Sequence, residues 1–311
     1  MNVWSVRPVI GDDGVQIDAL LRAKADRLET LDPRLRLART RAAETAGLVA
    51  VDGTGSVGAH LRPDLVEFAE DDEMRSFAPD RAVSWRELAA SDTAALDAIV
   101  AAARVPEAAD MVMWPAADDE AAPRFARFGL EPASAFALRP PGPLTSGRSA
   151  TIRPARPEDA DAVSALHVEE VAFHEPHTPY VRVVPALEPA FRARLERLWS
   201  GAEGAPVIHV LEVDAAVAGM CESMVQTVRD EGGQLSPGRY GYLNSVAVGA
   251  RWRGQGFGRT LVSAVLADLA GYDIDGYTLW FALGNPLSSR VWPRLGFRQL
   301  WISYERREAV P

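Results

Sequence analysis

The stretch that decides the fold lies between residues 251 and 259 and reads Arg251-Trp252-Arg253-Gly254-Gln255-Gly256-Phe257-Gly258-Arg259. It follows a predicted strand over 242–248 and opens a predicted helix over 256–269. Three glycines at alternate positions let the backbone approach an anion closely. The first amides of a helix have no internal acceptor and lie at the positive end of its dipole. The stretch therefore predicts a main-chain site for a pyrophosphate, to which the arginines can add charge.

Two other nucleotide sites also use a glycine-rich turn between a strand and a helix. A dinucleotide fold needs an acidic residue about 20 residues later, at the end of the next strand. Asp273 and Asp275 lie near that distance but precede the next predicted strand, 277–282. A nucleoside-triphosphate loop needs Gly-Lys-Ser/Thr, which the stretch lacks. A glycine-rich turn that binds nothing is the remaining alternative.

The segments around this stretch alternate between the periods of strands and helices. We expect a mixed α/β domain around one sheet, with a polar, glycine-rich loop at 229–238. The predicted strands are 150–153, 207–213, 216–228, 242–248, 277–282 and 298–304, and the predicted helices are 160–173, 191–199, 256–269 and 286–295.

The two halves of the chain share features at constant spacing. Trp114 and Phe281 open similar stretches, Gly129 and Gly296 close them, and both pairs are 167 residues apart. A strand, a short helix ended by glycine and another strand would produce both stretches. We interpret the chain as a duplication, with a domain at 1–140, a Pro-, Gly- and Ser-rich linker at 141–149 and a second domain at 150–311.

Composition narrows the class of protein. The chain has 311 residues, a net charge of −10 and a single cysteine, Cys221. It lacks the basic face of a nucleic-acid binder, a long apolar run that could span a membrane, and a signal-like segment within 1–13. We expect a cytoplasmic protein, monomeric or homodimeric, with no nucleic-acid or membrane partner.

The glycine stretch and two later motifs resemble the GNAT superfamily of acyl-CoA-dependent N-acyltransferases. Arg251, Gly254 and Gly256 match its Arg/Gln-x-x-Gly-x-Gly/Ala motif, and Asn285 precedes a match to its Leu-Gly-Phe motif at 295–297. The resemblance covers about 150–307. The first half resembles the same fold without the glycine motif, so we expect it to be a degenerate, structural or substrate-shaping copy. The architecture resembles the tandem, mycothiol-synthase-like members, which often pair one active copy with one eroded copy.

The resemblance implies acetyl-CoA as the co-substrate, a mixed central sheet flanked by helices in each half, and a set of cofactor contacts. The strand before the glycines would lend its backbone to the pantetheine arm, the following amides would bind the pyrophosphate, and two later side chains would lie near the thiol. The residues implied are Val246, Ala247, Val248, Arg253, Gly254, Gln255, Gly256, Phe257, Gly258, Arg259, Asn285 and Trp292.

The sequence indicates the catalytic groups less clearly than the cofactor contacts. Direct attack by an amine needs a proton acceptor, and we predict Tyr242 and Glu222 as catalytic, with Glu170 less favoured. Trp292 occupies the place where the family often has a tyrosine that protonates the thiolate, and indole is no acid. Tyr304 is a possible substitute.

The resulting prediction is an N-acetyltransferase that acts on a primary amine of a small molecule. The acidic segment 169–175 suits a cationic acceptor. Three histidines lie at 167, 174 and 177, and the last two fall beside Pro176 and Pro179, so we expect these histidines to line the acceptor site or the surface and expect no metal. The alternatives are a CoA-binding regulatory module without turnover and a protein N-acetyltransferase.

Overall fold

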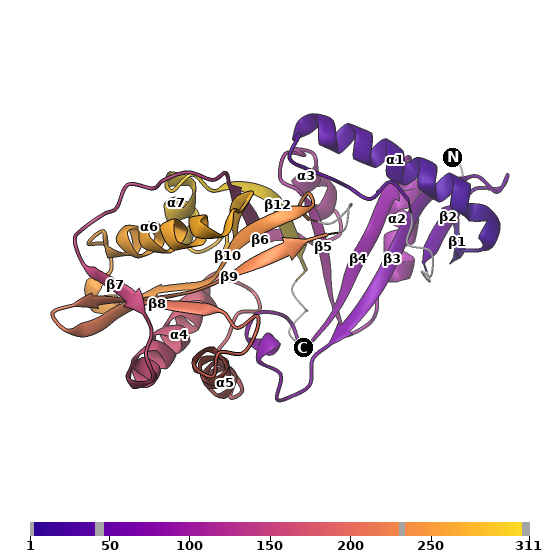
Figure 1. The fold of residues 1–311 in the computed structure, drawn as a ribbon. Helices are drawn as coiled ribbons and strands as arrows, with labels where there is room; N and C mark the ends of the chain where they lie inside the picture. The colour runs from indigo at the N-terminus through magenta and orange to yellow at the C-terminus, as the bar shows by residue number, and fades with distance from the viewer. Residues whose placement is uncertain (1–2, 41–46, 230–233, 307–311) are drawn as a thin grey trace.

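The computed structural model describes residues 3–40, 47–229 and 234–306. Their strands form one twelve-stranded sheet that runs through both halves of the chain (Figure 1). In the first half the strands are Ser5–Pro8 (β1), Leu48–Val51 (β2), Val57–Glu67 (β3), Arg81–Ala90 (β4), Ala109–Pro115 (β5) and Glu131–Arg139 (β6). In the second half they are Thr151–Pro154 (β7), Val207–Val213 (β8), Ala216–Val228 (β9), Gly238–Val248 (β10), Gly276–Ala282 (β11) and Arg298–Glu305 (β12).

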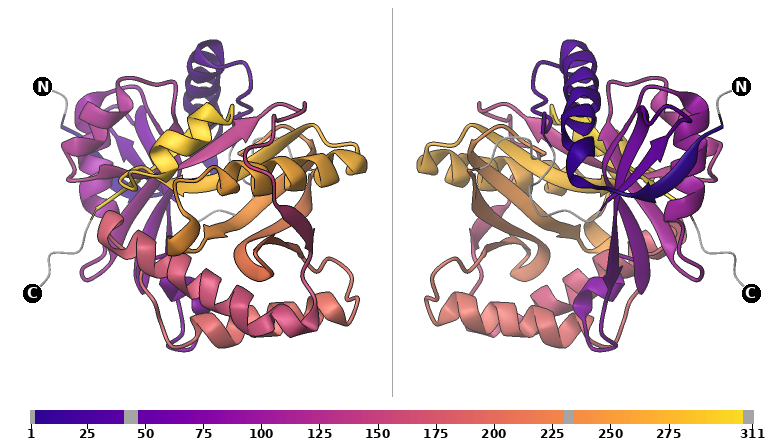
Figure 2. Two further views of the ribbon diagram at one scale, coloured as in Figure 1. Left: turned by 90° about the vertical axis from the view of Figure 1, so that its left-hand side faces the viewer. Right: turned by 90° about the vertical axis from the view of Figure 1, so that its right-hand side faces the viewer.

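Helices cover both faces of this sheet. They are Gly14–Leu31 (α1), Thr93–Ala103 (α2), Ala121–Ala126 (α3), Ala160–His174 (α4), Leu187–Trp199 (α5), Phe257–Leu269 (α6) and Ser288–Arg294 (α7). In the second half α4 and α5 lie on one face, while α6 and α7 lie on the other (Figures 1 and 2). Among these helices none has the length and hydropathy needed to cross a bilayer.

The element boundaries of the second half agree closely with those predicted. The helix expected at 191–199 begins earlier, at Leu187, because Pro189 falls in its first turn, where proline is tolerated. The strand expected at 242–248 begins at Gly238, which shortens the predicted loop at 229–238. Residues 230–233 of that loop lie outside the described residues.

The repeat extends from sequence motifs to element positions. β5 and β11 run over 109–115 and 276–282, and the difference of 167 that separates them also separates the starts of β6 and β12. At the other end Arg7 and Asp13 form a bidentate ion pair, and Arg153 and Asp159 form the same pair 146 residues later. Each aspartate also accepts the backbone N–H three residues before it, which fixes the entry to the following helix.

The two halves exchange their last strands. The order in the sheet is β1-β2-β3-β4-β5-β12-β6-β11-β10-β9-β8-β7. Thus β12 of the second half pairs antiparallel with β5 of the first, and β6 of the first half pairs antiparallel with β11 of the second. One hydrophobic core joins the halves, with Phe125 and Phe136 in the same cluster as Leu279 and Tyr304. The division at 141–149 remains a prediction, because neither half completes its sheet alone.

Candidate functional site

The glycine stretch forms a main-chain cradle at the start of α6. Gly254 and Gly256 have φ values of 73° and 88°, a left-handed conformation that favours glycine. Gly256 is the N-cap of α6 and provides no side chain to bond the helix amides. Within the described parts of the chain, no protein group accepts a hydrogen bond from the amides of residues 254–259. The protein itself thus leaves these amides without an acceptor, and their binding of a pyrophosphate remains a prediction.

The predicted arginines of the cradle already have protein partners. Arg253 donates to the carbonyl of Val248 at 2.8 Å and to Glu169 at 2.6 Å. Arg259 donates to the carbonyl of Thr145 at 2.7 Å. Each bond fixes the guanidinium beside the cradle and also uses part of its donor capacity.

A further cation beside the cradle comes from the linker between the halves. Arg148 donates to the side chain of Gln255 at 3.2 Å, and its guanidinium lies 5.1 Å from the ring centroid of Phe257. The hydroxyl of Thr260 on α6 donates to the carbonyl of Arg148 at 2.6 Å. Sequence reasoning missed Arg148, because a linker carries no period or motif that could indicate which helix it crosses.

The strand that leads to the cradle has one free edge. β10 pairs in parallel with β11 from Tyr240 to Leu243, and the ladder then stops although both strands continue. The register with β9 shifts between Leu243 and Ser245, which marks a bulge at Asn244. Beyond the bulge the carboxylate of Glu170 accepts a hydrogen bond from the backbone of Val246. Among the described residues, no strand pairs with the predicted pantetheine segment, 246–248, on the β11 side, and β9 pairs with it on the other side.

Asn285 and Trp292 hold α7 and its surroundings together. The side-chain oxygen of Asn285 accepts from the backbone N–H groups of Leu287 and Ser288, and the residue is 2% exposed. Trp292 makes an edge-to-face contact with Phe297 at 5.5 Å between centroids. Their predicted contacts near the thiol remain predictions.

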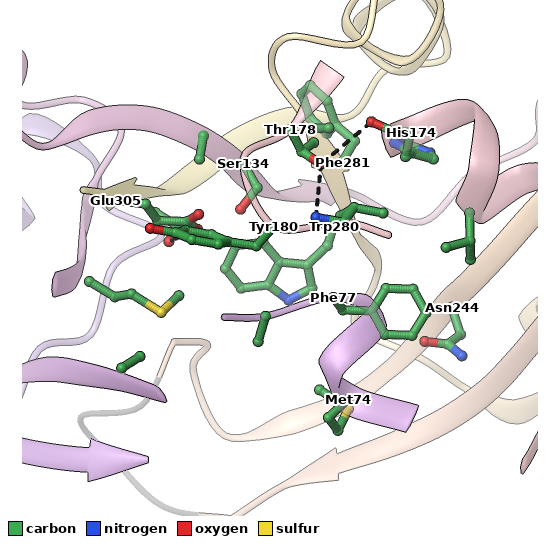
Figure 3. A pocket seen from close by; sticks show the side chains of 18 of the residues that line it. Met74, Phe77, Ser134, His174, Thr178, Tyr180, Asn244, Trp280, Phe281 and Glu305 are labelled. Atoms are coloured by element: carbon green, nitrogen blue, oxygen red, sulfur yellow. Dashed lines mark hydrogen bonds between the residues drawn. The ribbon is translucent and has the colours of Figure 1, made fainter. Parts of the chain in front are cut away.

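A cavity of about 680 Å³ lies beside the free edge of β10, and both halves build it. Most of its wall is apolar or aromatic, and Figure 3 shows Trp280 and Phe77 among its side chains. Tyr304 is not among the lining residues and packs instead against Phe125, at 5.0 Å between centroids. The acidic residues of the wall are Glu73, Glu170 and Glu305.

The three candidate proton acceptors differ in their surroundings. Glu222 is fully buried, accepts from Asn244 at 2.7 Å and pairs with Arg194 at 3.1 Å. Tyr242 lines the cavity, and burial, assisted by the nearby carboxylates, raises its pKa to about 12. Glu170 also lines the cavity, and its side chain keeps 22% exposure.

Glu170 has a perturbed pKa that suits proton transfer. Burial raises the pKa of its carboxyl to about 7, and the charge of Glu222 acts in the same direction. The hydroxyl of Ser245 and the backbone of Val246 donate to this carboxylate and oppose the rise. A carboxylate with a pKa near neutrality can both accept a proton and release it at physiological pH.

Two of the histidines lie around Glu170 and are neutral. Burial lowers the pKa of His167 to about 3 and that of His174 to about 4. His167 stacks on Phe191 at 4.3 Å between centroids, and His174 lies 3.8 Å from the Glu170 carboxylate. Within the described residues, no group of three potential metal ligands is found.

The first half lacks the cradle for a local reason. At the start of α2 the side chain of Asp92 accepts from the amides of Ala94 and Ala95 at 2.8 and 2.9 Å. The amides that are free in α6 are thus capped by the protein in α2. This agrees with the expectation that the first half is degenerate.

Comparisons with known proteins agree with this geometry. Residues 168–297 match the model of the acetyltransferase (GNAT) family. A GCN5-related N-acetyltransferase from Sphaerobacter thermophilus is 14% identical, and its structure superposes with a TM-score of 0.52 over 99% of this chain and 97% of that one. A tandem GNAT protein from the clavulanic acid biosynthesis pathway is 17% identical over 97% of this chain and 98% of that one, with a TM-score of 0.43. No curated protein matches significantly in sequence. Residues 168–297, in the second half, thus match the GNAT acetyltransferase family, and the chain as a whole shares the fold of the Sphaerobacter thermophilus protein.

Proposed function

We propose that the protein transfers the acetyl group of acetyl-CoA to a primary amine of a small molecule. One observation carries this proposal: the carboxylate of Glu170 lies in the cavity and bonds the free edge of β10, the strand that leads to the uncapped amides of α6. The same strand, β10, thus contacts the proton acceptor and leads to the main-chain anion site.

Acetyl-CoA would supply an activated thioester, and the protein would supply position and a proton acceptor. The acceptor enters as an ammonium and must lose a proton before its nitrogen can form a bond to the acetyl carbon. We assign this proton to Glu170 in preference to the other two candidates. A tyrosine with a pKa of about 12 is protonated at neutral pH, and Glu222 is held by Arg194. The carbon–sulfur bond breaks as the new bond forms, and a thiol with a pKa of about 8.5 can leave as thiolate and take its proton from water.

The shape of the cavity favours a small acceptor. Its volume of about 680 Å³ falls within the range of about 300–1,000 Å³ that small-molecule sites occupy. Its walls come from both halves, including Met74 and Phe77 of the first half and Trp280 of the second. A side chain presented by a folded protein would have to pass between these walls.

The test is acceptor-dependent release of CoA thiol from acetyl-CoA, measured with a panel of primary amines. We expect release with at least one amine, and mass spectrometry should detect its N-acetyl product. Tight binding of acetyl-CoA in calorimetry without release across the panel would favour the regulatory module. Absence of acetyl-CoA binding would overturn the proposal.

A further inference from the structure

Glu305 is a carboxylate in the cavity for which the proposed reaction has no use. It is the last residue of β12, the strand that the second half contributes beside β5. Its cross-strand partner on the neighbouring strand β5 is Met111, which also lines the cavity. In Figure 3, Glu305 and Tyr180 lie on one side of the cavity and Asn244 on the other, with the indole of Trp280 between them in this view. The strand exchange is what brings Glu305 to this wall.

The carboxylates of the cavity fall into two groups. Glu73 pairs with Arg194, which also pairs with the buried Glu222. Glu170 and Glu305, by contrast, have no lysine or arginine partner among the described residues. Among these residues, the only hydrogen bond to the side chain of Glu305 comes from the hydroxyl of Ser303, at 2.8 Å. Two carboxylates on an otherwise largely apolar wall therefore remain available to positive groups of a ligand.

We propose that the acceptor carries two amino groups separated by an apolar spacer, one presented to Glu170 for acetylation and the other held by Glu305. The inference rests on the proposed function for the amine that is acetylated, and it adds a binding site for the second amine. The apolar wall between the two carboxylates, which includes Trp280 and Met111, would contact the spacer. An aromatic face such as that of Trp280 also attracts a cation.

The charge of Glu305 is consistent with this role. Burial raises the pKa of its carboxyl, and the hydroxyl of Ser303 opposes the rise. The carboxylate is thus incompletely stabilised by the protein, and an ammonium would complete its hydrogen bonding. Glu305 would act as a specificity residue that binds the acceptor at a distance from the reacting nitrogen.

The experiment compares linear α,ω-diaminoalkanes with linear monoamines of the same length, in wild type and in Glu305→Gln. In wild type we expect kcat/KM for diamines to pass through an optimum in chain length, with a preference of about tenfold or more over the matched monoamine. Glu305→Gln should raise KM for the best diamine about tenfold, change kcat little and leave the monoamines within about twofold. Glu131→Gln is the matched control, since Glu131 is the exposed residue opposite Glu305 on β6.

A binding measurement separates this inference from the proposed function. Calorimetric titration of the acetyl-CoA-bound chain with the best diamine, or with 1,6-diaminohexane if none reacts, should give weaker binding in Glu305→Gln than in wild type. Such a loss without any turnover would support the second anchor and count against the transferase. Equal diamine binding in both proteins, or an unchanged diamine preference, would overturn the role of Glu305. A melting temperature matching that of wild type would show that the variant is folded.

Discussion

Glu170 and Lys24 occupy equivalent positions in the two halves and carry opposite charges. They are 146 residues apart, the same difference that separates the Arg7–Asp13 and Arg153–Asp159 pairs. Glu170 accepts from the backbone of Val246, whereas Lys24 donates to the carbonyl of Leu88 at 2.9 Å.

The two strand positions that these side chains bond are also equivalent. Leu88 is six residues after Ala82, which pairs with Ala109 at the start of β5. Val246 is six residues after Tyr240, which pairs with Gly276 at the start of β11. At this position the second half therefore has a carboxylate that can accept a proton, and the first half has the ammonium group of a lysine.

Lys24 is the only lysine of the chain, so its titration can be observed directly. Burial lowers the pKa of its ammonium to about 8, with Glu87 opposing this effect, and the group lies 5.0 Å from the Trp114 ring centroid. The side-chain signal of isotope-labelled lysine should titrate near pH 8 in the folded protein. A midpoint at 10 or above would contradict the burial described here.

The same shift predicts how stability depends on pH. Between pH 8 and the ordinary lysine pKa of 10.5 the unfolded chain binds more protons at Lys24 than the folded chain does. The free energy of unfolding contributed by this group should therefore rise with pH across that window, by at most about 3 kcal/mol. Lys24→Met should lack this rise when urea unfolding is measured at pH 8 and pH 10. Its affinity for acetyl-CoA should stay within about twofold of wild type, because the cradle lies in the other half.

Glu170→Gln should reduce kcat/KM by about 100- to 10,000-fold, the usual contribution of a general base. In wild type, kcat/KM should increase with pH through about 7, since the carboxylate must be deprotonated to accept a proton. In the variant this acidic limb should disappear. Glu158→Gln, at a side chain that is 67% exposed, is the control. If the acidic limb of the kcat/KM profile were unchanged in Glu170→Gln, a group other than Glu170 would accept the proton.

The same substitution should make the fold more stable at pH 8. The folded pKa of Glu170, about 7, lies above the ordinary value of 4.5, so ionising this carboxyl costs the folded state stability as pH rises. The cost is absent below pH 4.5 and complete above about pH 7, where it reaches at most about 3 kcal/mol. Thermal unfolding of Glu170→Gln and wild type should diverge at pH 8 and converge at pH 4.5. A loss of stability at pH 8 would show that the carboxylate is needed for packing.

The elements and the cradle followed from local patterns in the sequence. The glycine stretch lies between β10 and α6 as its position between the predicted strand and helix indicated, and the 167-residue repeat reappears in β5 and β11. These features depend on neighbouring residues, which a sequence displays directly.

The strand exchange and the choice of proton acceptor depend on contacts between distant residues. β6 and β12 are equivalent strands, and nothing in either pattern indicates which half completes its ladder. The sequence favours Tyr242 and Glu222 over Glu170, from their predicted strand positions and from the family resemblance. Only the packing of α4 on β10 shows that Glu170 is largely buried, reaches the cavity and bonds Val246.

Gly256→Ala should weaken acetyl-CoA binding at least tenfold. The added Cβ would meet only Arg148, at an ordinary contact distance of 3.7 Å, so we expect the effect to arise from the φ of 88°, which costs a non-glycine residue about 1–2 kcal/mol. Gly271→Ala, at a glycine with ordinary φ and open surroundings, is the control. Calorimetry measures the acetyl-CoA affinity of both variants. Equal affinities in Gly256→Ala and Gly271→Ala would show that the cradle does not bind acetyl-CoA.

The capped helix of the first half predicts the binding stoichiometry. Wild type should bind one acetyl-CoA per chain, since Asp92 occupies the amides that start α2. Asp92→Ala should lower the free energy of unfolding by about 0.5–2 kcal/mol, as expected for loss of an N-cap, without creating a second site. Calorimetric stoichiometry together with urea unfolding checks both parts. Two molecules bound per wild-type chain would contradict the degenerate reading of the first half.

Arg148→Ala should weaken acetyl-CoA binding about three- to tenfold. Its guanidinium is held by Gln255 and the Phe257 ring beside the free amides, so its charge is already in position for a phosphate and little ordering is needed on binding. Because the site is exposed, salt should screen this contribution, and the wild-type affinity should fall more steeply than that of the variant between 0.05 and 0.5 M NaCl, roughly the range where the Debye length drops below 10 Å. Arg156→Ala, at a side chain that is 62% exposed in the same half, should change neither the affinity nor its salt dependence. Parallel salt dependences for wild type and Arg148→Ala would mean that the linker arginine supports the local fold and does not bind the phosphates.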